Sequence, residues 1–124
     1  DILIPASVTD VINEINKANI RVKLIVEAGN IPMRESVEKE FFEKGVLIVP
    51  DFVANAGGVI SSYAEYRGYN PKRMFEMVKA KIVKSTRRVL ERSLKEKKNP
   101  RAVAMAIAQK LVEEKAKKRG TTFR

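Results

Sequence analysis

The chain contains 124 residues, enough for one domain with a single core. It has no cysteine and no histidine, which excludes disulfide scaffolds, thiolate or imidazole zinc sites, and catalytic triads built on either side chain. Its 44% apolar content and six glycines are ordinary for globular proteins, so neither a disordered nor a fibrous chain is expected. The chain begins at Asp1 inside an apolar run, and we expect it to be part of a longer polypeptide.

Charge divides the chain into two unequal halves. Residues 1–66 hold 6 basic and 10 acidic residues, for a net charge of −4, whereas residues 67–124 hold 19 and 5, for +14. A basic surface of that size attracts anions of any kind. We favour a solvated, lysine-rich helix surface over nucleic-acid binding, because aromatic interleaving and a glycine-flanked recognition motif are both missing. No long apolar run and no signal peptide is visible, so we expect a soluble, cytoplasmic protein without a membrane partner.

Three short runs rich in β-branched residues predict the strands of a parallel sheet, at 2–4, 23–26 and 46–49. They are apolar without alternation, which is typical of strands covered on both faces. Between them, the apolar spacing predicts helices over 9–18 and 34–44. Gly45 follows the second helix at the position of a C-cap glycine. The order of elements therefore predicts an α/β fold with β-α-β-α-β connectivity.

The second half of the chain predicts helices. Residues 55–66 read as a glycine-bearing turn that runs into a helix, placed at the carboxyl end of the third strand. Two long helices follow, with starts at Asn70-Pro71 and Asn99-Pro100, where asparagine caps the helix and proline takes its first position. We expect the first to reach about residue 95 and the second to stop near Gly120.

The segments that follow the strands form the candidate site, because ligands of open parallel sheets bind beyond the carboxyl ends of the strands. These segments are 5–7, 27–30 and 55–58, and each combines small residues with polar groups. Small residues let backbone amides approach a ligand closely, and Asn30 or Asn55 could offer an amide and a carbonyl to one nucleotide or carboxamide group. Such residues are also ordinary in turns, so the hypothesis depends on all three segments meeting at one sheet edge.

Other polar residues of the chain are weaker candidates for a functional site. Ser61 and Ser62 lack any candidate base, so we expect hydrogen bonding or helix capping from them and no nucleophilic role. Acidic residues over 34–44 alternate with lysines, which is typical of a solvated helix face. The sequence therefore predicts no metal site.

Three stretches resemble the carboxyl-terminal half of the glutamate/leucine/phenylalanine/valine dehydrogenase family, closest to its glutamate dehydrogenases. They are residues 1–6, 26–32 and 45–66, and the last contains the string Pro-Asp-x-x-Ala-Asn-Ala-Gly-Gly-Val at 50–59. Their order and spacing match as well as the motifs, and the resemblance covers essentially the whole chain. Ser62 resembles the glutamate dehydrogenases in particular, since branched-chain relatives tend to have an apolar residue there.

The resemblance implies a partial Rossmann-like three-layer α/β fold, with a short parallel sheet and two long C-terminal helices. It implies a single domain over 1–124, made of the second half of an NAD(P)-binding domain (about 1–66) and closing helices (about 70–119). It also implies oxidative deamination of L-glutamate to 2-oxoglutarate with NAD or NADP as the cofactor. The full-length enzyme would be a homo-oligomer.

The resemblance also assigns roles to particular residues. Asn30 would contact the cofactor near its nicotinamide ribose, and Asn55 would sit beside the nicotinamide and the reacting carbon. Ser62 would hydrogen-bond the side-chain carboxylate of glutamate, because a buried hydroxyl favours a carboxylate and is left unpaired by a leucine side chain. The residues implied in cofactor binding are Pro5, Ala6, Asn30, Asn55, Gly57 and Gly58.

The chain departs from the family pattern in two ways. The family's glycine-rich dinucleotide fingerprint and its catalytic lysine and aspartate are absent, so we assign no catalytic residue and predict that the chain alone is inactive. Residues 31–34 read Ile-Pro-Met-Arg where relatives usually show Gly-Pro-Thr-Thr, so the usual hydroxyl cap of the next helix is missing. The alternative hypothesis is a non-catalytic binding or regulatory module related to dehydrogenases, with basic helices that hold an anionic partner.

Overall fold

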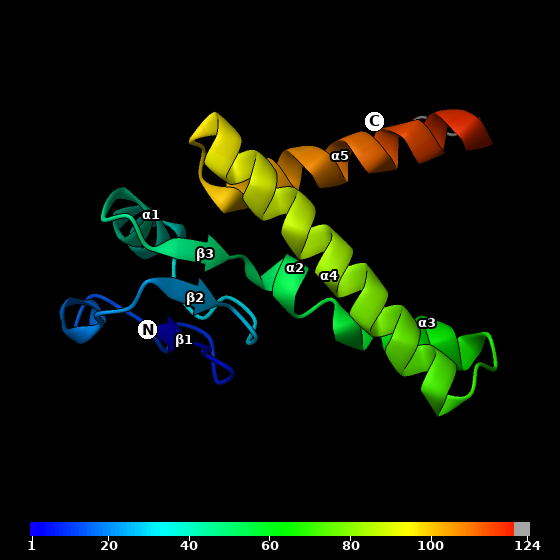
Figure 1. The fold of residues 1–124 in the computed structure, drawn as a ribbon, viewed down its shortest axis with the longest axis horizontal. Helices are drawn as coiled ribbons and strands as arrows, with labels where there is room; N and C mark the ends of the chain where they lie inside the picture. Colours follow the sequence, from blue (N-terminus) through cyan, green and yellow to red (C-terminus); the bar gives the residue numbers. More distant parts are fainter. Residues whose placement is uncertain (121–124) are drawn as a thin grey trace.

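The computed structural model describes residues 1–120 and shows a three-stranded parallel sheet with helices on both faces (Figure 1). Strands β1 (Ile2–Leu3), β2 (Leu24–Val26) and β3 (Leu47–Val49) lie side by side in that order. Ile25 in the central strand pairs in register with Leu3 on one side and Ile48 on the other. Each predicted strand is confirmed, and the structure shortens each by one residue.

Alternate side chains of the strands enter two separate cores. On one face, Ile25 and Ile48 pack against helix α1 (Glu35–Glu43). On the other face, Val49 packs against helices α4 (Pro71–Glu96) and α5 (Pro100–Arg119). This arrangement explains why the strands are apolar without alternation, and it confirms the predicted α/β layering. The buried residues that α4 and α5 contribute are Val89, Val103, Ala104 and Ile107.

The helix predicted over 9–18 is wrong. The segment forms turns that end in a short 3-10 helix, η1 (Lys17–Asn19). Asn16 holds these turns, since its Nδ2 donates to the Val11 carbonyl at 2.7 Å and its Oδ1 accepts from the Asn13 N–H at 2.9 Å. Short amide side chains that bond to nearby backbone offer an alternative to helical hydrogen bonds, and here that alternative prevails over the apolar spacing.

The other helices follow their predicted signals. α1 is followed by Gly45, whose φ of 82° lies in the left-handed region that glycine adopts without strain. Asn70 Oδ1 accepts the N–H of Arg73 at 2.9 Å at the start of α4, and Asn99 Oδ1 accepts the N–H of Arg101 at 2.8 Å at the start of α5. α4 ends at Glu96, and Gly120 caps α5, as predicted.

Two helices fill the segment after β3. They are α2 (Asp51–Ala54) and α3 (Gly57–Tyr66), so the predicted glycine-bearing turn is a junction between helices. Figure 1 shows α3 beside the first half of α4, away from the sheet. A Cβ atom on Gly57 would lie 3.3 Å from Val78 Cγ1, so glycine allows the two helices to pack closely.

Candidate functional site

The segments that follow β1 and β2 meet through their backbones at the carboxyl edge of the sheet. The Gly29 N–H donates to the Pro5 carbonyl at 2.8 Å. A Cβ atom on Gly29 would lie 2.8 Å from the Ser7 carbonyl oxygen, which is closer than real contacts allow. Glycine is therefore required for this approach. Pro5 is buried here, and Ala6 is exposed.

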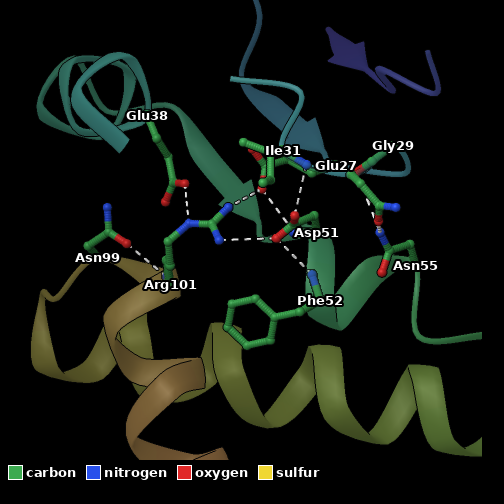
Figure 2. A network of polar contacts seen from close by, with 10 residues as sticks. Glu27, Gly29, Ile31, Glu38, Asp51, Phe52, Asn55, Asn99 and Arg101 are labelled. Carbon is green, nitrogen blue, oxygen red and sulfur yellow. Dashed lines mark hydrogen bonds and ion pairs between the residues drawn. The ribbon is translucent and has the colours of Figure 1, made fainter. Parts of the chain in front are cut away.

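The segments that follow β2 and β3 meet through two asparagine side chains. Asn55 Nδ2 donates to Asn30 Oδ1 at 2.7 Å. The same nitrogen lies 3.5 Å from the Gly29 carbonyl oxygen, and Figure 2 shows Asn55 beside Gly29. Within residues 1–120, Asn30 Nδ2 and Asn55 Oδ1 make no hydrogen bond. The pair therefore presents one amide donor and one carbonyl acceptor together. All three predicted segments meet at one sheet edge, as the site hypothesis required.

The start of α3 continues this edge. A Cβ atom on Gly58 would have no heavy atom within 4 Å, so the residue faces open space. Ser61 Oγ and Ser62 Oγ both donate to the Gly58 carbonyl, at 2.8 and 3.1 Å. These contacts match the hydrogen-bonding role expected for the two hydroxyls. Ser62 lies one helical turn beyond Gly58 and is exposed in this chain, so the buried hydroxyl expected at this position is not observed.

A buried ion cluster lies beside the asparagine pair (Figure 2). Its centre is Arg101, in the first turn of α5, whose guanidinium uses three nitrogens to reach three carboxylates. Nη2 lies 2.6 Å from Glu27 Oε2, Nε lies 2.5 Å from Glu38 Oε2, and Nη1 lies 3.0 Å from Asp51 Oδ1. Glu27 and Glu38 are 0% and 1% exposed. The planar fork of arginine suits this arrangement, because lysine has no such fixed set of donors.

The same carboxylates also hold the backbone of the candidate site. Glu27 Oε2 accepts the N–H of Asp51 at 2.9 Å. Asp51 Oδ1 accepts the N–H of Phe52 at 2.9 Å, and Asp51 Oδ2 accepts the N–H of Ile31 at 3.0 Å. The cluster is therefore hydrogen-bonded to the loop that carries Asn30.

The carboxylates of the cluster differ in their affinity for protons. Burial raises the pKa of Glu27 to about 7, although the Arg101 charge opposes the rise. Burial also acts to raise the pKa of Asp51, but the Ile31 and Phe52 amides and the Arg101 charge outweigh it, so that this pKa lies below its usual value. Three carboxylates share one guanidinium, so a proton on Glu27 reduces the excess negative charge.

The profile of the Glutamate/Leucine/Phenylalanine/Valine dehydrogenase family matches residues 1–120. The chain belongs to this family. A glutamate dehydrogenase from Aeropyrum pernix is 36% identical over 130 residues, which cover 97% of this chain and 31% of that protein. An NADP(+)-dependent glutamate dehydrogenase from Pyrobaculum calidifontis is 47% identical over 66 residues, which cover 53% of this chain and 16% of that protein. An NAD-specific glutamate dehydrogenase from Staphylococcus aureus is 34% identical over 97% of this chain and 30% of that protein.

Solved structures of two amino-acid dehydrogenases share this fold. A glutamate dehydrogenase from Peptoniphilus asaccharolyticus matches with a TM-score of 0.79 at 28% identity, over 94% of this chain and 31% of that one. An L-tryptophan dehydrogenase from Nostoc punctiforme matches with a TM-score of 0.82 at 24% identity, over 92% of this chain and 34% of that one. The Rossmann-type fold expected from the family resemblance is therefore confirmed. The chain spans about a third of the length of these proteins or less.

Sequence reasoning missed the ion cluster of this dehydrogenase-family chain. Arg101 stands among the basic residues of the second half, which we interpreted as solvated surface. A signal was present, because Glu27 directly follows one buried strand and Asp51 lies two residues after the next, at the same sheet edge. Buried carboxylates require a partner cation, so two of them at one edge predict a nearby lysine or arginine.

Within residues 1–120, no group of three or more acidic side chains is placed to hold a metal ion. None of the helices in that part of the chain has the length and apolar character needed to cross a membrane.

Proposed function

We propose that this chain supplies cofactor and substrate contacts to an NAD(P)-dependent glutamate dehydrogenase, which converts L-glutamate to 2-oxoglutarate by oxidative deamination. Family membership supports the proposal, and so do the names of its relatives, which include NADP-dependent and NAD-specific glutamate dehydrogenases. One observation in this chain itself supports the proposal. Asn55 of the family-matching motif contacts Asn30 at the carboxyl edge of the sheet, where α/β folds bind nucleotides.

The chemistry of the site fits a nicotinamide cofactor. The asparagine pair offers a donor and an acceptor, which complement the carboxamide and ribose groups of such a cofactor. Gly58 leaves space where any other side chain would project. When bound, the cofactor accepts the hydride that leaves the substrate α-carbon. The role of this chain is to orient the two reactants so that little motion is needed before transfer.

The proposed role of Ser62 is to select the substrate side chain. Its hydroxyl donates to the Gly58 carbonyl at 3.1 Å, and rotation about the Cβ–Oγ bond would direct that hydrogen to a substrate carboxylate. A hydrogen bond to a charged group contributes about 1.5–3 kcal/mol, and an aliphatic substrate cannot replace it. This difference would favour glutamate over amino acids of similar length without the carboxylate.

The direct test uses the full-length polypeptide that carries this chain. With NAD⁺ or NADP⁺ present, we expect reduction of the cofactor that depends on L-glutamate, with a higher kcat/KM for glutamate than for norvaline or leucine. The 124-residue chain alone should show no turnover, because it lacks the glycine-rich fingerprint and the family's catalytic lysine and aspartate. Absence of glutamate oxidation in the full-length protein, or an equal preference for leucine, would contradict the proposal.

A further inference from the structure

A strained residue lies next to Asn30. Ile31 has a φ of 46°, in the left-handed region that β-branched side chains rarely adopt. Its side chain is 50% exposed, so packing does little to force this conformation. Such strain persists only where the surroundings over-determine the backbone.

Two hydrogen bonds hold the strained residue in place. The Ile31 N–H donates to Asp51 Oδ2 at 3.0 Å, and the Ile31 carbonyl accepts the N–H of Asp10 at 2.9 Å. The first bond depends on the orientation of the Asp51 carboxylate. That carboxylate is fixed through its other oxygen by Arg101 Nη1 at 3.0 Å and the Phe52 N–H at 2.9 Å.

A continuous series of contacts therefore leads from α5 to the candidate cofactor site. It begins at Arg101, passes through Asp51 to Ile31, and reaches the adjoining Asn30, which accepts a hydrogen bond from Asn55. Arg101 itself is oriented by two further buried carboxylates, at 2.5 and 2.6 Å. The Asp51 carboxylate in the middle of the series thus has hydrogen-bond partners on both of its oxygens.

We propose that Arg101 is a positioning residue for the nicotinamide cofactor, because it clamps Asp51 and thereby holds the left-handed Ile31 and the Asn30–Asn55 pair in the binding geometry. The inference rests on the proposed function for the identity of the ligand. Arg101 touches neither the cofactor nor the substrate in this role. It acts through the loop after β2, because its contact with Asp51, which accepts the Ile31 N–H, joins α5 to that loop.

The first test is Arg101→Lys in the full-length enzyme. Lysine keeps the positive charge of the cluster but cannot present three donors in one plane. We expect the KM for NAD⁺ or NADP⁺ to rise about tenfold or more, with a smaller change in kcat, since one charge-assisted hydrogen bond in the series is lost. Arg92→Lys is the matched control, because Arg92 pairs at 2.6 Å with Glu96 on the exposed part of α4. The control should leave the KM within about twofold of the parent, as surface ion pairs contribute little.

The second test separates positioning from general stability. Glycine adopts the left-handed region without strain, so Ile31→Gly removes the need for the clamp. We expect Arg101→Lys to raise the cofactor KM much less in an Ile31→Gly background than in the parent. An equal effect of Arg101→Lys in both backgrounds would overturn the inference, because a purely structural role does not depend on residue 31.

A third measurement does not depend on catalysis. Hydrogen–deuterium exchange at Ile31 should be faster in Arg101→Lys than in the parent, and unchanged in Arg92→Lys. Should Arg101→Lys fail to fold, Asp51→Asn tests the same link, since its amide places a donor against a donor at Ile31 or Arg101. A parent enzyme that does not oxidise glutamate rejects the proposed function. An active parent whose cofactor KM is unaffected by Arg101→Lys and Asp51→Asn rejects the clamp alone.

Discussion

Arg101 donates to the Asp51 carboxylate at 3.0 Å although 50 positions separate the two in the sequence. The contact joins the first turn of α5 to the first turn of α2, where the candidate site begins. Because Arg101 also pairs with two buried glutamates, loss of this one side chain leaves several carboxylates without a counter-ion. Removal of one partner from a buried ion cluster costs far more than removal of a surface charge.

The free energy of unfolding should fall as the pH rises from about 5 to about 7, because of Glu27. The folded state keeps this proton up to a pKa of about 7, whereas the ordinary value is 4.5. The folded state therefore binds more protons than the unfolded state across this window, and a rise in pH favours unfolding. The pKa of Asp51 is lowered, so the stability that its ionised carboxylate contributes to the folded state is lost only at more acidic pH.

Glu27→Gln isolates this effect, since glutamine keeps the size of the side chain and does not titrate. In urea unfolding, we expect the free energy of unfolding of the parent to fall by about 2 kcal/mol relative to that of the variant across this window. Glu113→Gln, an exposed position on α5, is the control and should follow the parent. Parallel pH profiles for the parent and Glu27→Gln would show that Glu27 does not carry the dependence.

Much of the fold could be predicted from local signals. The strands predicted at 2–4, 23–26 and 46–49 could be recognised because each is mostly apolar without alternation, since both sheet faces are covered. The caps at Asn70 and Asn99 could be predicted because each depends on one side chain and its own helix. The helix predicted over 9–18 failed because asparagine side chains bind the local backbone, and apolar spacing does not report that competition.

The candidate site was predicted only in part. Asn30 and Asn55 were recognisable as residues that follow adjacent parallel strands, which end at the same sheet edge. The ion cluster was not, because Arg101 reaches Glu27 across 74 positions and its pattern resembles that of a surface arginine. The left-handed backbone of Ile31 could not be predicted from isoleucine itself, although the resemblance places a glycine at this position in relatives, which is the residue that such a backbone favours.

Ser62→Val should weaken selection for glutamate. In the full-length enzyme, we expect the ratio of kcat/KM for glutamate to that for norvaline to fall about tenfold or more, because a hydrogen bond to the carboxylate is lost. Ser61→Val is the matched control, since Ser61 donates to the same Gly58 carbonyl and no substrate contact is assigned to it. Equal ratios in the Ser62 variant and the parent would remove Ser62 from the substrate site.

Asn70→Ala should destabilise the protein by about 1 kcal/mol, because the Arg73 N–H loses its acceptor at the start of α4. Asn70→Asp should retain the parent stability, since a carboxylate also accepts this hydrogen bond and is favoured at a helix N-terminus. Chemical denaturation of the three proteins measures the difference. If the alanine and aspartate variants were equally destabilised, the capping bond would not be the cause.

Gly58→Ala in the full-length enzyme tests most directly whether this sheet edge holds the cofactor. A Cβ atom at residue 58 would meet no protein atom within 4 Å, so we expect the free energy of unfolding to stay the same or to rise by up to about 1 kcal/mol. Gly29→Ala is the contrasting variant and should be destabilised, because its Cβ atom would lie 2.8 Å from the Ser7 carbonyl oxygen. The decisive measurement is the Kd for NAD⁺ and NADP⁺ of Gly58→Ala, which should rise about tenfold or more as the new methyl group overlaps the bound nicotinamide. An unchanged Kd in a variant of unchanged stability would contradict cofactor binding at this edge.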